Sequence, residues 1–318
     1  MRALAPRPPS ASARRGYTKI KQLGKGAFGV VHLVTPTSPS NATDAKRKLV
    51  MKEISLRGLS PKEQQATRNE VAVLRKIEHP HVIRYHDSFI EAGTLCICME
   101  HASGGDLDQM IQGHIQKKSR VAEAEIWRLL AQMTSALEYC HHAVHLLHRD
   151  LKPANILLNE RGEVKLADFG VSKMLAMSQQ LAKTQCGTPL YMSPELCAGK
   201  EYGLSSDVWA LGCVVYELMA LSPPWLDQCG PRGFPGGISG LMKAVASSRI
   251  SLAKVTPHYS SELCELLGSL LSKDPADRPA LTAVLQMPVI QRELPRPAET
   301  AGAAAEAPTE TPTGAGAG

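Results

Sequence analysis

Short runs of β-branched and apolar residues alternate with Gly- and Pro-containing turns through the first hundred positions. Such runs occupy residues 17–34, 49–56, 82–90 and 94–100 and predict strands, with a polar loop over residues 35–48. Ser60-Pro61-Lys62-Glu63 is a capping-box sequence with proline at the first helical position, so a helix is expected from there to about Ile77. The pattern therefore indicates a sheet that carries one helix.

Helical spacing takes over after Gly104-Gly105. A long amphipathic helix is predicted by apolar residues three or four positions apart, namely Ile126, Leu129, Leu130, Met133, Leu137 and Cys140. Short strands are expected near residues 156–158 and 164–166, followed by helices near residues 206–220, 238–247, 260–271 and 280–286. A strand-rich beginning joined to a helix-rich remainder indicates an α+β protein with two lobes, residues 17–100 and 101–292.

Both ends of the chain differ from this pattern. Residues 1–16 consist mainly of Ala, Pro, Ser and Arg, and residues 293–318 contain one large apolar side chain, so both are expected to be disordered tails. The first tail is Arg-rich and free of acids, and it weakly resembles an organelle-targeting peptide. Pro6, Pro8 and Pro9 would break the amphipathic helix that such a peptide needs, so targeting stays the lesser alternative.

Composition argues against several classes of protein. The net charge of +6 includes +4 from residues 1–16, and the rest has no dense Lys/Arg block, so a nucleic-acid partner is not expected. The longest apolar run, residues 210–221, contains Glu217 and is too short to cross a bilayer, and no secretory signal is recognised in the first 16 residues. We expect neither a membrane nor a nucleic-acid partner.

The eight cysteines do not follow metal or redox spacings. No C-x-x-C pair is present, and Cys96 and Cys98 fall on one face of a predicted strand, so buried free thiols are expected. Free thiols favour a reducing, intracellular location, most simply the cytoplasm. A metal cluster is the lesser reading of the residues that crowd one helix end, Cys140, His141, His142, His145 and His148, because histidine is ordinary at a helix C-terminus.

A glycine-rich motif lies where the first two strands should meet. Gly24, Gly26 and Gly29 are followed by a strand, whereas a dinucleotide-binding motif is followed by a helix. The motif therefore favours a hairpin whose backbone N–H groups face phosphates. In the next strand, Lys52 is the natural partner for Glu70, because Glu70 falls on the apolar stripe of the predicted helix and needs a cation there.

The densest group of polar residues lies between positions 148 and 170. His148-Arg149-Asp150-Leu151-Lys152-Pro153-Ala154-Asn155 is followed by Asp168-Phe169-Gly170. Asp and Asn oxygens are ligands that Mg²⁺ prefers, and a second Asp beside them can accept the proton of a hydroxyl. The alternative is a turn-rich loop whose polar side chains only cap the backbone.

These motifs, in this order, resemble the eukaryotic protein kinase family over residues 17–292. The likeness extends to Gly187-Thr188-Pro189, Ser193-Pro194-Glu195, Asp207-Val208-Trp209-Ala210-Leu211-Gly212 and Arg278-Pro279. The resemblance implies the bilobal protein kinase fold, with a small β-rich lobe and a larger helical lobe. It also implies ATP and Mg²⁺ as cofactors.

The resemblance gives each matching residue a role. Asp150 would accept the proton of the substrate hydroxyl, and Lys152 would steady the transferring phosphoryl group. Lys52 would contact the α- and β-phosphates and pair with Glu70. Two residues, Asn155 and Asp168, would hold Mg²⁺. Further contacts to ATP would come from Leu23, Gly24, Gly26, Gly29, Val31, Val50, the gatekeeper Met99, the hinge residues Glu100 and Ala102, and Leu157 below the adenine.

Within the kinase family, the chain is most similar to NIMA-related kinases. Lys152, two residues after Asp150, is typical of serine/threonine kinases, and the NIMA-like segments are 68–71, 79–83, 104–107, 182–189 and 191–196. Val50 and Ser193 replace the alanines usual in the family, although the NIMA-related kinases also have the serine. Residues 229–238 look like a Gly/Pro-rich insertion, for which the sequence indicates no role.

We therefore expect a serine/threonine protein kinase with protein substrates; association with the cytoskeleton or cilium is a further implication of the resemblance. The alternatives are a pseudokinase scaffold and a small-molecule kinase, and segment 187–195 favours protein substrates over the latter. Thr184 matches the activating threonine of NIMA-related kinases. Its phosphate, added in trans by transient self-association, would pair with Arg149 and order residues 174–186.

Overall fold

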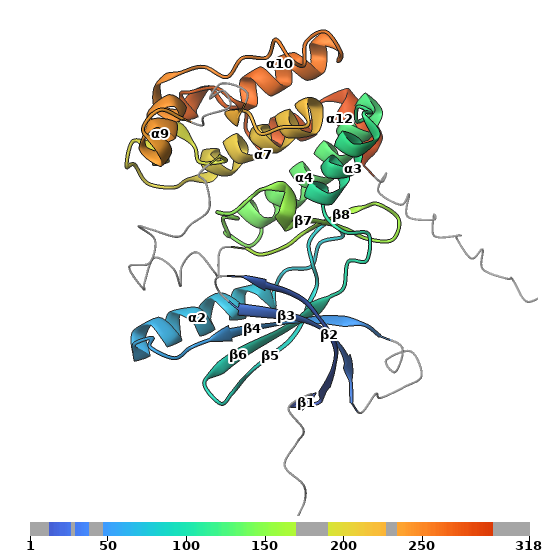
Figure 1. The fold of residues 1–318 in the computed structure, drawn as a ribbon, viewed down its shortest axis with the longest axis vertical. Coiled ribbons are helices and arrows are strands. Elements are labelled where there is room, and N and C mark those ends of the chain that lie inside the picture. The colour runs from blue at the N-terminus through green and yellow to red at the C-terminus, as the bar shows by residue number, and fades with distance from the viewer. Residues whose placement is uncertain (1–12, 27–28, 38–46, 170–189, 227–233, 295–318) are drawn as a thin grey trace, which may run out of the picture.

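A computed structural model describes residues 13–26, 29–37, 47–169, 190–226 and 234–294, and the side chains of residues 13, 14, 66 and 68–70 lie outside that description. The described chain forms one lobe built on a sheet and a second built from helices (Figure 1). The α+β class and the two-lobed arrangement predicted from the sequence are confirmed.

The smaller lobe is a six-stranded antiparallel sheet with the strand order β1-β2-β3-β4-β6-β5. Apolar residues on one face of the sheet pack against helix α2 (Pro61–Leu74), which runs beside it in Figure 1. The strands are β1 (Ala13–Arg14), β2 (Tyr17–Gly26), β3 (Gly29–Pro36), β4 (Leu49–Ser55), β5 (Tyr85–Glu91) and β6 (Thr94–Glu100).

Strand β1 corrects the predicted extent of the first tail. It lies within residues 1–16, which the composition indicated to be disordered, and it pairs with the start of β2 through Ala13–Thr18 and Arg14–Tyr17. Gly16 has a φ of 84°, which lets the chain reverse between the two strands. The backbone ladder thus orders residues whose side chains gave no strand signal, while residues 1–12 and 295–318 lie outside the described chain.

Helix α2 begins as predicted and ends earlier than predicted. The Ser60 side chain accepts a hydrogen bond from the Glu63 amide, and the Glu63 side chain accepts one from the Ser60 amide. The helix stops at Leu74, three residues before Ile77. Ile77 is buried in the core of the larger lobe, so tertiary packing takes this side chain away from the helical path.

The chain between α2 and β5 is hydrogen-bonded to the larger lobe. Val82 forms a parallel bridge with Leu166, the Ile83 amide donates to the Leu166 carbonyl at 2.9 Å, and the Leu166 amide donates to the His81 carbonyl at 2.8 Å. Val82 and Ile83, predicted as the start of a strand, are therefore bonded to the larger lobe instead, and β5 begins at Tyr85.

The larger lobe is organised around two buried helices, α4 (Glu123–His142) and α7 (Leu204–Ala220). All residues of α7 from Ser206 to Ala220 are buried, which explains its nearly continuous apolar sequence. The other elements are α3 (Leu107–Lys117), η1 (Pro153–Asn155), β7 (Ile156–Leu158), β8 (Val164–Leu166), α6 (Pro194–Cys197), α9 (Gly237–Ser247), α10 (Ser261–Leu270), η3 (Pro275–Asp277), α11 (Leu281–Leu285) and α12 (Pro288–Glu293).

The cysteines that the structure describes are free thiols. Cys96 and Cys98 are both buried on one side of β6, as the two-residue spacing predicted. Burial raises the pKa of the Cys98 thiol to about 12, which keeps it protonated and unreactive. Within the described ranges, no helix combines the length and the apolar character needed to cross a membrane.

Candidate active site

The glycine motif forms the hairpin between β2 and β3. Gly26 pairs with Gly29, Gly24 pairs with Val31, and a strand follows the motif, as predicted. A Cβ atom on Gly29 would lie 1.9 Å from the Glu53 carbonyl oxygen, so only glycine fits against β4 here. Residues 27–28 at the tip lie outside the described chain, and Leu23 beside the motif is exposed.

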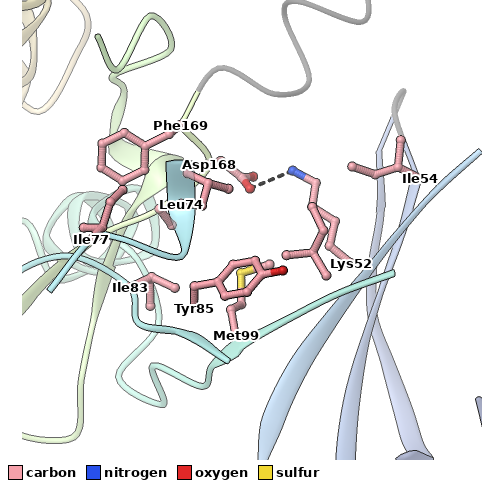
Figure 2. A pocket seen from close by; sticks show the side chains of 11 residues that line it. Lys52, Ile54, Leu74, Ile77, Ile83, Tyr85, Met99, Asp168 and Phe169 are labelled. Carbon is pink, nitrogen blue, oxygen red and sulfur yellow. Dashed lines mark hydrogen bonds and ion pairs between the residues drawn. The ribbon is translucent and has the colours of Figure 1, made fainter. Parts of the chain in front are cut away.

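Lys52 connects the two lobes by an ion pair. It lies next to Val31 across the β3–β4 ladder, and its Nζ atom is 2.6 Å from Oδ1 of Asp168, as Figure 2 shows. The Lys52 side chain is 12% exposed and that of Asp168 is 41% exposed, so the carboxylate faces open space while the lysine is largely enclosed. Glu70 belongs to α2, but its side chain is outside the description, so the Lys52–Glu70 pair stays a prediction.

Asp168 has an uncommon backbone conformation. Its φ is 56°, in the left-handed region that Asp and Asn enter more easily than other non-glycine residues. Next to it, Phe169 is 5% exposed and its ring centroid lies 4.7 Å from that of His148. Burying Phe169 while turning Asp168 outward gives the two adjacent residues separate tasks, one in packing and one in the site.

Met99 and apolar residues of both lobes line a cavity behind the Lys52–Asp168 pair. Figure 2 shows Leu74, Ile77, Ile83, Tyr85 and Phe169 around it. The predicted gatekeeper therefore stands at the inner end of the site, on the strand that leads to Glu100 and Ala102.

The predicted hinge uses its side chain away from the site. The Glu100 carboxylate accepts hydrogen bonds from Lys165 at 2.8 Å and from the Arg84 amide at 3.0 Å. Successive residues of a strand point to opposite faces, so Met99 and Glu100 point apart. Leu157 lies in β7, opposite Lys165 of β8, which places the predicted floor residue in the larger lobe.

Asp150 is held by two neighbours in the segment that the sequence singled out. Its Oδ2 atom accepts hydrogen bonds from Lys152 Nζ at 2.8 Å and from Asn155 Nδ2 at 2.8 Å. Asn155 Nδ2 also donates to the Asp150 backbone carbonyl at 2.7 Å. Both described hydrogen bonds of the Asn155 side chain use its nitrogen, which leaves Oδ1 available to a ligand.

The Asp207 side chain holds the backbone of residues 148 and 149, which directly precede Asp150. Its buried carboxylate accepts hydrogen bonds from the amides of His148 at 2.8 Å and Arg149 at 3.0 Å, from His141 Nε2 at 2.8 Å, and from the Tyr202 hydroxyl. Burial opposes ionisation of this carboxyl, but the hydrogen bonds from His141 and Tyr202 lower its pKa overall. The Arg149 backbone has a φ of 64°, a strained value that this contact helps to hold.

Asp207 lies in one of the kinase-like motifs of the sequence, but no role was predicted for it. The sequence signal for such a role is the single carboxylate at the start of an apolar helix, because a buried charge needs hydrogen-bond or ionic partners. The contacts around Asp207 also bear on the His and Cys residues near the end of α4, for which a metal cluster was the lesser alternative. Cys140 is buried in the core, His141 pairs with Asp207, and His148 packs on Phe169. Within the described ranges, no group of three or more His, Cys, Asp or Glu side chains is arranged to hold a metal ion.

Two further carboxylates brace the segment that follows residues 170–189. Glu195 forms a bidentate ion pair with Arg278, with N–O distances of 2.9 and 2.8 Å, and it also accepts a hydrogen bond from Ser206. Burial alone would raise the pKa of Glu195, but the bonds from Arg278 and Ser206 lower it to about 2. Glu217 in α7 accepts a hydrogen bond from the Tyr191 hydroxyl at 2.6 Å.

Glu217→Gln is expected to stabilise the fold at pH 8 and to have little effect at pH 5. Burial, with a smaller contribution from Asp108, raises the pKa of Glu217 to about 7 against the bond from Tyr191, from an ordinary 4.5. The folded state therefore keeps a proton that the unfolded state loses, and stability falls as the pH rises from 4.5 to 7. The loss is at most about 3 kcal/mol. Glutamine keeps the acceptor for Tyr191 without a charge.

The measurement is the free energy of unfolding of both proteins at pH 5 and pH 8. Glu160→Gln, which changes an exposed carboxylate, is the matched control and should shift neither value. An equal change for Glu217→Gln at both pH values would contradict the titration of a buried carboxyl.

Residues 17–290 match the protein kinase domain family. The chain is 38% identical to mouse serine/threonine-protein kinase Nek1 over 278 residues, which cover 87% of this chain and 22% of Nek1. It is 38% identical to the probable serine/threonine-protein kinase nek2 of Dictyostelium discoideum over 276 residues, or 85% of this chain and 61% of that protein.

Human serine/threonine-protein kinase Nek5 is 36% identical over 281 residues, covering 88% of this chain and 37% of Nek5. The region of similarity is thus most of the present chain but only a fifth to three fifths of these relatives. The family match over residues 17–290 includes every described residue that was predicted from the sequence to belong to the site.

Proposed function

Because the chain belongs to the protein kinase family and, within it, to the NIMA-related serine/threonine kinases, we propose that it transfers the γ-phosphoryl group of Mg-ATP to serine and threonine hydroxyls of protein substrates. The observation that carries the proposal is that two carboxylates of the site, Asp150 and Asp168, are held by different partners. Asp150 is held by Lys152 and Asn155, whereas Asp168 is held by Lys52 of the other lobe.

Asp150 is the group that accepts the proton of the substrate hydroxyl. Its Oδ2 atom is fixed by two donors, while its side chain remains 30% exposed and open to an incoming hydroxyl. Lys152, whose Nζ atom is 2.8 Å from Asp150 Oδ2, supplies a cation beside this carboxylate for the transferring phosphoryl group. Phosphoryl transfer has little covalent chemistry for the protein to perform, so positioned charges do most of the work.

ATP is bound between the lobes. The glycine hairpin covers the phosphates, and Lys52 contacts the α- and β-phosphates from the neighbouring strand. Adenine would be held by Val31 and Val50 of the smaller lobe, by Leu157 of the larger one, and by backbone groups of Glu100 and Ala102. This use of the hinge backbone is consistent with a Glu100 side chain that is already bonded to Lys165.

Asn155 and Asp168 are suited to hold Mg²⁺. The described hydrogen bonds of the Asn155 side chain use Nδ2 and not Oδ1, and Asp168 is the more exposed member of its ion pair. One amide and one carboxylate oxygen, completed by phosphate oxygens and water, form an ordinary magnesium environment. When bound, the ion would neutralise charge on the phosphates, and the two residues would orient it.

Phosphate transfer to casein or myelin basic protein tests the proposed activity. We expect incorporation of label from [γ-³²P]ATP that requires Mg²⁺ and stops with EDTA, on Ser and Thr after hydrolysis of the product. Asp150→Asn should retain the fold and lose nearly all transfer. Binding of substrate proteins without any transfer by the wild-type protein would support a scaffold instead.

Thr184 phosphorylation is proposed to switch the enzyme on. Residues 170–189 lie outside the described chain, so the proposal rests on Arg149, whose backbone is fixed by Asp207 next to Asp150. A phosphate adds nearly two negative charges and can bind an arginine bidentately. Pairing with Arg149 would order the segment and align the substrate with Asp150. The phosphate is added in trans, by transient self-association of two copies.

Thr184→Ala and Arg149→Ala are each expected to lower transfer at least tenfold, and the double variant should be little worse than either, because both remove one interaction. The measurement is initial rate per molecule, together with mass spectrometry of the phosphorylated sites. Ser178→Ala, in the same segment, is the control and should retain most activity. Full activity of Thr184→Ala, or activity that survives phosphatase treatment, would refute the switch.

We further propose that the protein works in a reducing, intracellular compartment. All six cysteines of the described chain are free, and five of them are buried. Such thiols need no oxidising environment for folding.

A further inference from the structure

A second cavity of about 510 Å³ lies behind the predicted hinge. Its walls come from the start of β4, the start of β5, the end of β6, β8 and the segment before β5, through residues such as Leu49, Arg84, Glu100 and Lys165. Adjacent residues of these strands, Val50 and Met99, belong to the proposed nucleotide site. Because side chains alternate along a strand, the second cavity opens on the opposite face of the sheet.

The lining is dominated by groups that carry or accept positive charge. Two carboxylates, Glu78 and Glu100, face four permanent cations, which gives the lining a formal charge of +2 with neutral imidazoles. The cations are Arg47, Lys48, Arg84 and Lys165, and the imidazoles are His79, His86 and His101.

The two carboxylates do not neutralise the cavity. Glu100 is occupied by Lys165 at 2.8 Å, and the contact of Glu78 with Arg84 is long, at 3.9 Å, between two well-exposed side chains. Exposed pairs of this kind contribute little. A guanidinium nitrogen of Arg47 lies 3.1 Å from Nε2 of His86, so a cation and an imidazole already share one wall.

The positive charge around the cavity contributes to lower pKa values of two of its imidazoles, those of His86 and His101. Burial lowers the pKa of His86, and the neighbouring Arg47 and Arg84 lower it further against the opposing effect of Glu100. Burial also lowers the pKa of His101, with additional contributions from Lys48 and Lys21. An anion in the cavity would reverse these charge effects.

The apolar part of the lining offers little surface to a peptide. Leu49, Ile77 and Val82 are 4%, 4% and 2% exposed, so their side chains are already used in the core. The surface left for a ligand is polar and cationic, and the volume lies within the range of small-molecule pockets. Guanidinium groups are suited to bind phosphoryl oxygens in pairs, and lysine and imidazole add single N–H donors.

We propose that this cavity binds a small oligophosphate anion, with Arg47, Lys48, Arg84 and His86 as its principal contacts. The site is separate from the proposed nucleotide site and does not depend on phosphoryl transfer. The anion would lie beside the Lys165–Glu100 ion pair and the His101 side chain, next to the backbone that is proposed to meet adenine.

Isothermal titration of the full chain with inorganic tripolyphosphate, in EDTA and 150 mM salt, tests the site. Wild-type protein should bind with saturation. Arg84→Ala and Lys48→Ala should each weaken binding about tenfold, since each removes a charged donor. The hydrogen bond that the Arg84 amide donates to the Glu100 carboxylate is kept in Arg84→Ala, and unchanged melting temperatures will show that both variants fold.

Two controls separate this site from other cationic regions. Arg57→Ala removes an exposed cation of the same lobe outside the cavity and should leave the affinity unchanged. Lys52→Met removes the phosphate contact of the proposed nucleotide site and should also leave it unchanged. Loss of binding in Lys52→Met but not in Arg84→Ala would overturn the proposal, as would absence of saturable binding up to 1 mM. Binding of a phosphothreonine peptide without binding of tripolyphosphate would overturn the ligand class.

Discussion

Asp168→Asn is expected to reduce phosphoryl transfer about a thousandfold, in the range found when one preorganised electrostatic contact is removed from an active site. The carboxylate is 41% exposed and is paired with Lys52 at 2.6 Å, so its contribution is charge rather than packing. Asparagine has the same shape and tolerates the φ of 56° at this position. The backbone and the burial of Phe169 should therefore be preserved.

The measurement is kcat with casein, together with the melting temperature. Glu160→Gln neutralises an exposed carboxylate elsewhere in the larger lobe and should retain full activity. Lys52→Met should also have very low turnover, and combining it with Asp168→Asn should add little, because residues that act as a unit are not additive. Near-normal turnover of Asp168→Asn would show that the assignment of Asp168 to the metal is wrong.

Arg278→Leu is expected to lower the free energy of unfolding by about 3 to 5 kcal/mol, the cost of leaving one member of a buried ion pair alone. The guanidinium is enclosed and all five of its N–H groups donate, two to Glu195 and three to backbone carbonyls of Ser205, Ser272 and Lys273. It also lies over the Trp209 ring, with 5.2 Å between Cζ and the ring centroid.

Chemical denaturation of the variants provides the test. Arg278→Lys should also be destabilised, because an ammonium has three donors and cannot form the bidentate contact. Arg278→Leu combined with Glu195→Leu should recover part of the loss, since no charge is then left buried without a partner. Arg161→Leu changes an exposed arginine and should stay within about 0.5 kcal/mol of wild type. A similar small effect for Arg278→Leu would contradict the structural role.

The sequence predicted those elements whose signal is local. The capping box at Ser60 marked the start of α2, and the burial of α7 follows from its apolar composition. The end of α2 and the start of β5 could not be predicted in this way. Ile77 and Val82 are apolar in either conformation, and their positions depend on packing and bridging with the larger lobe. Strand β1 similarly depends on its partner strand rather than on its own residues.

The residues of the candidate site were predicted one by one from the sequence, but most of the hydrogen bonds and ion pairs between them were not. Asp150, Lys152 and Asn155 are close in sequence, so their contacts follow from one short segment. The ion pair of Lys52 with Asp168 spans 116 positions, and the hydrogen bond from the His148 amide to the Asp207 carboxylate spans 59. Sequence spacing indicates which residue types are present, whereas only the tertiary fold determines which of them meet.

The bridge between Val82 and Leu166 bears on how the two lobes can move relative to each other. Chain connectivity joins them after Glu100, but residues 81–83 are joined to β8 by backbone hydrogen bonds as well. Two separate attachments define a line, and a motion that preserves both is a rotation about that line. We therefore expect the site to open and close by rotation about that line, because twisting or sliding of one lobe over the other would break the backbone hydrogen bonds of Ile83 and Leu166.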